Sequence, residues 1–238
     1  MEMNKITNNQ PQVSRLVPSR AFHFCLIFGT LSVILLNSTG CAIIAMAAKG
    51  IGEKKPAAYA GLAGQSAGVM VWADRGVRAD WPSVQLDLAN LIQNKLSKST
   101  AIELKGTTWP VQAASIVRYQ TDHPGIEAAP ITDIAPKLGV SQLIYIELDN
   151  FSTRSEVSMQ MFRGNVSATL KIIQTQNGQS SIAYQEASIH AFYPPKSPPE
   201  GVMNSDDLTV YRGAIAAMAD EIVNRLMTHD VEPESASD

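Results

Sequence analysis

The chain has 238 residues and a net charge of −3, with 45% apolar and 17% charged residues. Lys and Arg are scattered rather than gathered into a basic stripe, which argues against a nucleic-acid partner. Both cysteines, Cys25 and Cys41, lie in the first 41 residues, so the rest of the chain can form neither a disulfide nor a thiolate metal site. This length fits one domain plus a targeting segment.

The N-terminus has the pattern of a secretory signal. Residues 1–20 are polar with a small positive excess, residues 21–36 are apolar, and "NSTGC" follows. The small residues before Cys41 resemble the lipobox of bacterial lipoprotein signals, although Ser38 stands where that pattern usually has Leu. We therefore predict a lipoprotein-type signal over residues 1–40 and lipidation at Cys41.

Two alternatives remain open for the same segment. A membrane-spanning helix needs about 20 apolar residues, which 21–36 reaches only by continuing past the polar residues 37–39 into 41–48. An uncleaved single-pass anchor and a plain cleaved signal are therefore the other two interpretations. All three place the following domain in the cell envelope, outside the cytoplasm.

Composition divides the remaining chain into three parts. Residues 41–65 are rich in Ala, Gly and Lys and predict a linker that tethers the domain. The acidic stretch 230–238 predicts a disordered tail. Between them, residues 66–229 predict one globular α/β (α+β) domain with a single mixed sheet and helices packed on it.

Local patterns predict the elements of this domain in chain order. The predicted strands are 68–73, 101–105 and 141–148, followed by a hairpin of 165–173 and 180–193 around Asn177-Gly178. The predicted helices begin at Ser83, cover 111–121, cover 131–139 with Gly139 as the stop, and begin again near 205–207. The stretch 74–82 predicts a loop.

The run "GQSAG" matches the nucleophile elbow of hydrolases at Ser66, and Asp207 and His229 follow in the hydrolase order. The elbow requires a strand before its serine and a helix after it. Here a linker precedes Ser66 and a strand follows it. We therefore predict that the protein is not an enzyme.

Other polar residues offer weaker candidates. His123, His190 and His229 lack the spacing of metal ligands, so no metal or cofactor is expected. Glu147 and Asp149 could line a pocket at a strand end, although a polar strand terminus explains them more simply.

The Met-rich segment 154–164 has two interpretations. It is either an adaptable binding surface or an ordinary connection between two strands.

The run "ITDIAPKLGVSQLIYIELDNFS", a short helix ending at Leu-Gly and leading into an apolar strand, resembles a family of bacterial envelope lipoproteins. This family includes peptidoglycan-synthase activator lipoproteins, the curli secretion pore subunit and the N-terminal domain of the Tol-system β-propeller protein. "STGC", "GVMVWA", the helix from Ser83 and "AIAAMADEIVNRL" follow in the corresponding order. The resemblance covers about residues 66–228 and implies a domain that binds envelope proteins without chemistry of its own. Only Cys41 is carried over from the family as a functional residue.

The resemblance does not extend to a pore. Each strand of a membrane barrel needs about 9–11 alternating residues, and 151–164 has room for one at most. We therefore expect a membrane-anchored, non-catalytic accessory or scaffold protein of the envelope that acts through protein–protein contacts, its oligomeric state left open. The rival hypothesis is a small-molecule-binding auxiliary domain of a transport system, using Glu147 and Asp149.

Overall fold

The computed structural model describes residues 53–231. The predicted signal over 1–40, the lipidation site Cys41, the linker residues 42–52 and the tail residues 232–238 lie outside the described residues. Within residues 53–231, no helix combines the length and the apolar character needed to cross a bilayer.

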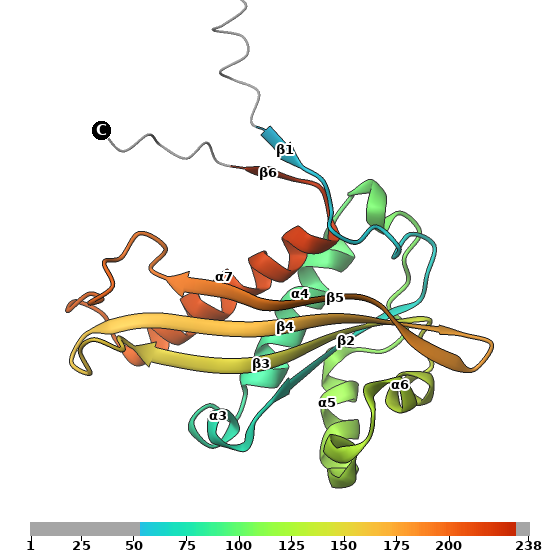
Figure 1. The fold of residues 1–238 in the computed structure, drawn as a ribbon, viewed down its shortest axis with the longest axis horizontal. Coiled ribbons are helices and arrows are strands. Elements are labelled where there is room, and N and C mark those ends of the chain that lie inside the picture. Colours follow the sequence, from blue (N-terminus) through green and yellow to red (C-terminus); the bar gives the residue numbers. More distant parts are fainter. Residues whose placement is uncertain (1–52, 232–238) are drawn as a thin grey trace, which may run out of the picture. The chain divides into compact units, whose positions relative to one another are not determined.

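A mixed four-stranded sheet forms the centre of the domain in the order β2-β3-β4-β5 (Figure 1). Strand β2 (Ala67–Ala73) runs parallel to β3 (Gln142–Arg154). Strands β4 (Phe162–Gln176) and β5 (Gln179–Tyr193) follow in antiparallel order. The predicted fold class, a single mixed sheet with helices packed on it, is confirmed.

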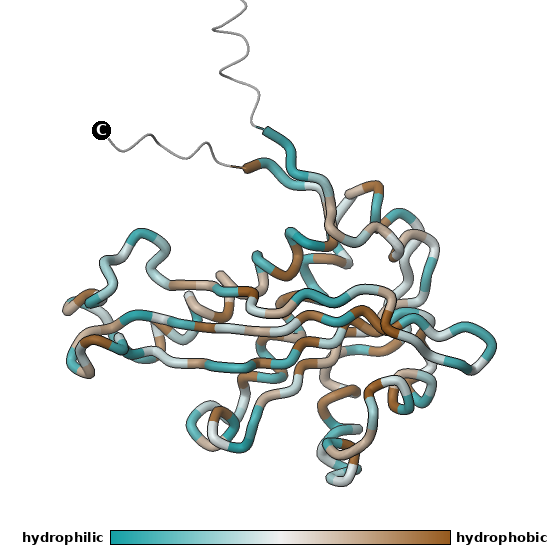
Figure 2. Tube along the Cα trace, in the orientation of Figure 1, coloured by the Kyte–Doolittle hydropathy of each residue, from teal (hydrophilic) through white to brown (hydrophobic). Residues whose placement is uncertain are grey.

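The β4–β5 hairpin turns at the predicted Asn-Gly pair. Asn177 and Gly178 have φ angles of 53° and 78°, the left-handed conformations that a tight two-residue hairpin turn requires. Figure 2 shows hydrophilic residues (teal) at the tip of this hairpin and hydrophobic residues (brown) alternating with hydrophilic ones along the strands.

Two long helices cover one face of the sheet. Helix α4 (Val84–Lys98) and helix α7 (Asp207–Leu226) pack against the strand residues that point to this face. The alternation of β3 directs Ile144 and Ile146 toward the helices, where both are fully buried. Asp206 caps α7 by accepting a hydrogen bond from the Thr209 amide at 2.9 Å, in agreement with the predicted helix start.

The opposite face is covered at one end only. Four short elements pack there on β2 and on the neighbouring ends of the other strands, and they form a second core with Met70, Leu143 and Ile173. These elements are α5 (Ala113–Asp122), η2 (Pro124–Ala128), α6 (Ile131–Ile134) and η3 (Ala135–Leu138). Within residues 53–231, no helix covers the far end of this face, which explains why polar residues occupy it.

Several local predictions were wrong. Residues 101–105 do not form a strand: Ile102–Leu104 is a short 3-10 helix, η1, in which Leu104 is buried and Ile102 is 77% exposed. The predicted loop 74–82 contains helix α3 (Arg75–Asp80), capped by the Asp74 carboxylate, which accepts from the Val77 amide at 2.8 Å. Strand β3 continues past Leu148 to Arg154 across an irregularity near Asp149.

The second half of the predicted linker is part of the fold. Strand β1 (Glu53–Lys55) pairs with β6 (His229–Val231), and the Leu62 side chain is fully buried in the main core. The Tyr59 amide donates to the Arg225 carbonyl at 3.0 Å. Residues 53–65 therefore pack on the domain, and residues 230–231, predicted to belong to the tail, form part of a strand.

Candidate protein-contact site

Two loops meet at one end of the sheet (Figure 1, left). Residues 155–161 connect β3 to β4, and residues 194–206 connect β5 to α7. Phe162 and Val202 exchange two backbone hydrogen bonds of 2.8 and 2.9 Å, which join the loops at their bases. We call residues 155–161 and 194–206 together the loop end.

Hydrogen bonds within the first loop, and one to the second loop, hold the backbone of the first loop. The buried Ser155 hydroxyl accepts from the Val157 amide at 3.2 Å and donates to the Pro199 carbonyl at 3.0 Å. The Ser155 amide donates to the Met161 carbonyl at 3.0 Å. Since these bonds fix the backbone, the loop presents its side chains on a defined scaffold.

Three apolar side chains of the loop end point into solvent. Val157 is 67% exposed, Met159 is 78% exposed and Met203 is 76% exposed. Val157 and Met159 are two residues apart on the first loop, and Met203 lies on the second loop, which is joined to it at Phe162 and Val202. Contiguous exposed apolar side chains mark interaction sites, and methionine adapts its shape to different partners. The Met-rich segment is thus a connection between two strands, as one of its two interpretations predicts, and Val157 and Met159 on it are exposed.

An ion pair fixes the base of the loop end to helix α7. Arg154 donates from Nε and Nη2 to the two carboxylate oxygens of Asp207 at 3.0 and 2.5 Å. The Thr153 hydroxyl donates to the same carboxylate at 2.6 Å. The Thr153 hydroxyl, and then Arg154, hold the pKa of Asp207 below its usual value. This bidentate ion pair connects the end of β3 to the start of α7.

A polar pocket of about 490 Å³ lies beneath the first loop, on the uncovered part of the sheet. Its floor comes from β4 and β5, and its wall includes Glu156, whose carboxylate accepts from the Asn165 amide group at 2.6 Å. The Arg163 guanidinium lies over the Phe192 ring, 4.7 Å from its centre. The pocket is lined by Asn150, Arg154, Ser155, Glu156, Val157, Arg163, Asn165, Ser167, His190, Phe192 and Pro199.

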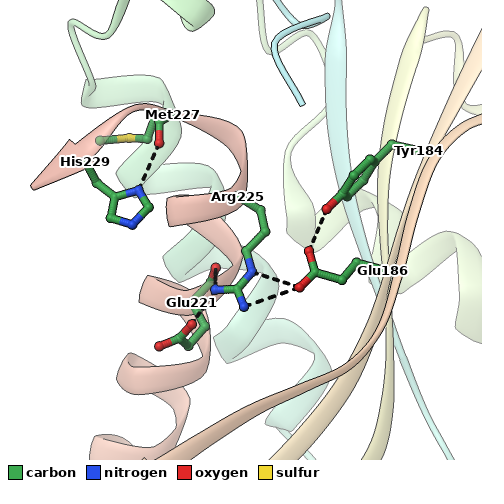
Figure 3. A network of polar contacts seen from close by, with 6 residues as sticks. All are labelled: Tyr184, Glu186, Glu221, Arg225, Met227 and His229. Atoms are coloured by element: carbon green, nitrogen blue, oxygen red, sulfur yellow. Dashed lines mark hydrogen bonds and ion pairs between the residues drawn. The ribbon is translucent and has the colours of Figure 1, made fainter. Parts of the chain in front are cut away.

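The structure separates Ser66, Asp207 and His229. Ser66 Oγ accepts from the Ser141 amide at 2.9 Å at the start of β3, whereas Asp207 is bonded near the end of that strand. About twelve residues of extended chain separate Ser141, which binds Ser66, from Thr153, which binds Asp207. This corresponds to a distance of roughly 40 Å. His229 lies in β6 with Nδ1 3.2 Å from the Met227 carbonyl (Figure 3). These three residues cannot act as one triad.

The three histidines considered as metal ligands are also dispersed. His123 Nδ1 lies 2.9 Å from the carbonyl of Tyr119 in its own helix, and His190 lines the polar pocket. Across residues 53–231, no three His, Cys, Asp or Glu side chains converge in a way that could hold a metal ion.

Glu147 and Asp149 lie in the middle of β3, so neither a strand-end pocket nor a polar strand terminus, the two interpretations of these residues, is correct. Lys171 Nζ donates to Glu147 at 2.8 Å, and the Thr169 hydroxyl donates to Asp149 at 3.1 Å. Glu147 and Lys171 border a recess of about 310 Å³ whose walls include Trp72 and Tyr145. Burial, and then the Glu147 carboxylate, raise the pKa of Tyr145.

The sequence matches no protein-family model and no curated protein. A comparison with solved structures finds matches that include the following three. The hypothetical protein CT253 from Chlamydia trachomatis is 12% identical, with a TM-score of 0.35, covering 68% of this chain and 99% of that one. A PelC dodecamer from Paraburkholderia phytofirmans is 14% identical, with a TM-score of 0.38 and coverages of 75% and 99%. Lipoprotein GNA1162 from Neisseria meningitidis is 15% identical, with a TM-score of 0.39 and coverages of 67% and 98%.

Proposed function

We propose that this protein is a non-catalytic accessory or scaffold protein of the bacterial cell envelope that binds another envelope protein through the loop end. The observation that carries the proposal is the exposure of Val157, Met159 and Met203 on two loops that hydrogen bonds join. The loop backbone is already ordered, so binding loses little further conformational freedom.

The energy available at the loop end fits a specific but moderate contact. Burial of the exposed two thirds to three quarters of Val157, Met159 and Met203 contributes roughly 1–2.3 kcal/mol each, or about 3–7 kcal/mol together. Association itself costs at least about 4 kcal/mol. The apolar side chains therefore need a second contribution, and the polar pocket beside Val157 can supply it by accepting a polar side chain of the partner.

Membrane attachment in this proposal comes from the sequence pattern at Cys41. A chain anchored there has twelve residue steps before β1 begins at Glu53. A fully extended chain spans at most about 3.6 Å per residue, so the domain stays within roughly 40 Å of the membrane. The mass of the protein purified from its own membranes tests the anchor: we expect a chain that begins at Cys41 and carries acyl groups. Replacement of Cys41 by Ala should leave the chain without them.

The contact is tested by placing a photo-reactive amino acid at Met159 in intact cells. We expect one crosslinked product of defined mass, containing a second envelope protein. The matched control is Ile102, which is 77% exposed on η1, outside the loop end. Replacing Met203 by Ser should weaken the product formed from position 159. Equal products from positions 102 and 159 would show that the loop end is not a specific contact site.

A second candidate function is small-molecule binding in the recess beside Glu147. The observation that favours it is the combination of apolar and aromatic walls with the Lys171–Glu147 ion pair at the border, which is typical of ligand pockets. A ligand that binds the folded chain raises its melting temperature. This function predicts that such a compound stabilises the unmodified protein and fails to stabilise a Trp72→Ala variant.

A further inference from the structure

The charged side chains of the polar pocket differ in how their charges are compensated. Arg154 is bound to Asp207 through two of its nitrogens. The Glu156 carboxylate is exposed to solvent and accepts from the Asn165 amide group at 2.6 Å. Arg163, by contrast, forms no ion pair with any acidic side chain of residues 53–231.

The Arg163 side chain is half-buried without an acidic partner. Its Nε is shielded from solvent and has no hydrogen-bond partner in the described part of the chain. Nη1 donates to the Pro199 carbonyl at 3.2 Å, and the guanidinium lies over the Phe192 ring. A neutral carbonyl and an aromatic ring compensate a half-buried cation less completely than a carboxylate does. The pocket therefore favours an anion that reaches the terminal nitrogens of Arg163.

Polar side chains of three strands form the floor beside Arg163. Because side chains alternate along β4, Gly164 faces α7, where an added methyl would meet a side chain of that helix, and Arg163 faces the uncovered side. Ser167 lies opposite Asn150 of β3 and opposite His190 of β5. These three side chains line the pocket, and each carries an N–H or O–H donor. The floor can thus donate hydrogen bonds to an anion held by Arg163.

The pocket is continuous with the loop end. The Pro199 carbonyl, on the second loop, accepts from both Arg163 and the Ser155 hydroxyl of the first loop. Val157, which is 67% exposed, is part of the pocket wall. One segment of a partner can therefore cover Val157 and place a side chain in the pocket.

We propose that the polar pocket is a carboxylate-binding site, which an aspartate or glutamate side chain of the partner fills by pairing with Arg163. A planar guanidinium can bind both oxygens of a carboxylate at once. Solvent weakens the repulsion between the exposed Glu156 and a single negative charge, whereas a dianionic phosphate would be repelled twice as strongly. This inference rests on the proposed function, because it identifies the group that the partner presents at the loop end.

Two short peptides test the site in the full-length chain, purified in detergent. They are acetyl-Ala-Glu-Ala-amide and the same peptide with uncharged Gln in place of Glu. The NMR signals of the Asn150 and Asn165 side-chain amides report binding, since both residues line the pocket. We expect the Glu peptide to bind roughly 10- to 100-fold more tightly, because its bonds to Arg163 are charge-assisted. Arg163→Gln should lose this preference, and Arg163→Lys should keep part of it.

The matched control is Arg118→Gln, at an exposed position of α5 outside the pocket, which should keep the full preference. The proposal is overturned if the unmodified chain binds both peptides equally. It is also overturned if Arg163→Gln, with its signals outside the pocket unchanged, still prefers the Glu peptide. Displacement of the Glu peptide by inorganic phosphate at equal concentration would show that the pocket is not specific for a carboxylate.

The crosslink from position 159 is a separate readout. That crosslink without a preference for the Glu peptide overturns the carboxylate site and leaves the loop-end contact standing. A preference for the Glu peptide without the crosslink supports the carboxylate site, and the proposed protein contact is then the part that fails.

Discussion

Replacing Leu62 by Ala tests whether residues 53–65 are part of the folded domain. The Leu62 side chain is 0% exposed, and its carbonyl accepts from the Thr107 hydroxyl at 2.7 Å. The substitution removes three carbon atoms, which at ~0.8 kcal/mol each gives about 2.4 kcal/mol of lost burial. The cavity left behind raises this to roughly 2.7–5 kcal/mol. For a domain of this size, 3 kcal/mol lowers the melting temperature by roughly 6–12 °C.

The assay is urea and thermal unfolding of the full chain, followed by circular dichroism. The matched control is Leu208→Ala in the first turn of α7, where the same side chain is 52% exposed and should cost less than about 1 kcal/mol. A shift of Leu62→Ala as small as that of the control would refute the reasoning. Residues 53–65 would then behave as the linker that their composition indicates.

Three further substitutions test individual contacts. In Gly164→Ala the new methyl would lie 2.7 Å from a side-chain carbon of α7, so we expect a loss of about 1–3 kcal/mol in urea unfolding; an unchanged midpoint would contradict the close packing of β4 and α7. Gly178→Ala places a side chain at a φ of 78° and should cost about 1 kcal/mol in a thermal melt; no loss would mean that the turn has another conformation. Asp207→Asn removes the ionised partner of the Thr153 hydroxyl and Arg154. Because the folded pKa of Asp207 is lowered, its stabilisation is complete above the unfolded pKa of about 4 and is lost as pH falls through the folded pKa. Urea midpoints of the unmodified chain and this variant should therefore converge as pH is lowered from about 6 to about 3, and a constant difference would count against the ion pair.

Long periodic segments were predictable from the sequence because their apolar residues repeat at the period of a helix or a strand and so mark one buried face. Helices α4 and α7 and the two hairpin strands follow such patterns, and Asn177-Gly178 identified the turn. The end of β3 was not predictable in this way. Its last residues are mostly polar because one face of the sheet is uncovered there. The change from apolar to polar residues, which usually indicates the end of a strand, therefore occurs in the middle of β3.

Short elements failed for a different reason. Residues 101–105 have an alternating pattern, but Ile102 is exposed and Gly106, with a φ of 77°, turns the chain away. In the predicted linker, small residues indicated flexibility, whereas the buried Leu62 side chain, the Tyr59–Arg225 backbone bond and the β1–β6 pairing hold the segment on the domain. Asp74 is a typical helix N-cap and could have indicated the start of α3, but Gly76 disfavours a helix at this place.

One of the two loops of the candidate site could be predicted from the sequence. The Met-rich segment drew attention to Val157 and Met159 as a binding surface, although its exposure could not be known. The second loop could not be connected with it, since the backbone bonds between Phe162 and Val202 join positions 40 residues apart. Likewise, the partner of Glu147 depends on the β3–β4 register, in which Lys171 lies opposite Tyr145.

The pairing of β1 with β6 gives the domain a nearly cyclic chain path. Glu53 lies directly opposite Val231, and opposed residues of an antiparallel pair have Cα atoms about 4.5–5.5 Å apart. A short peptide could therefore join these two positions without disturbing the sheet. A circularly permuted chain opened at the 177–178 turn would keep every strand pairing of the domain, so its architecture depends on the cyclic order of its elements rather than on which element is made first.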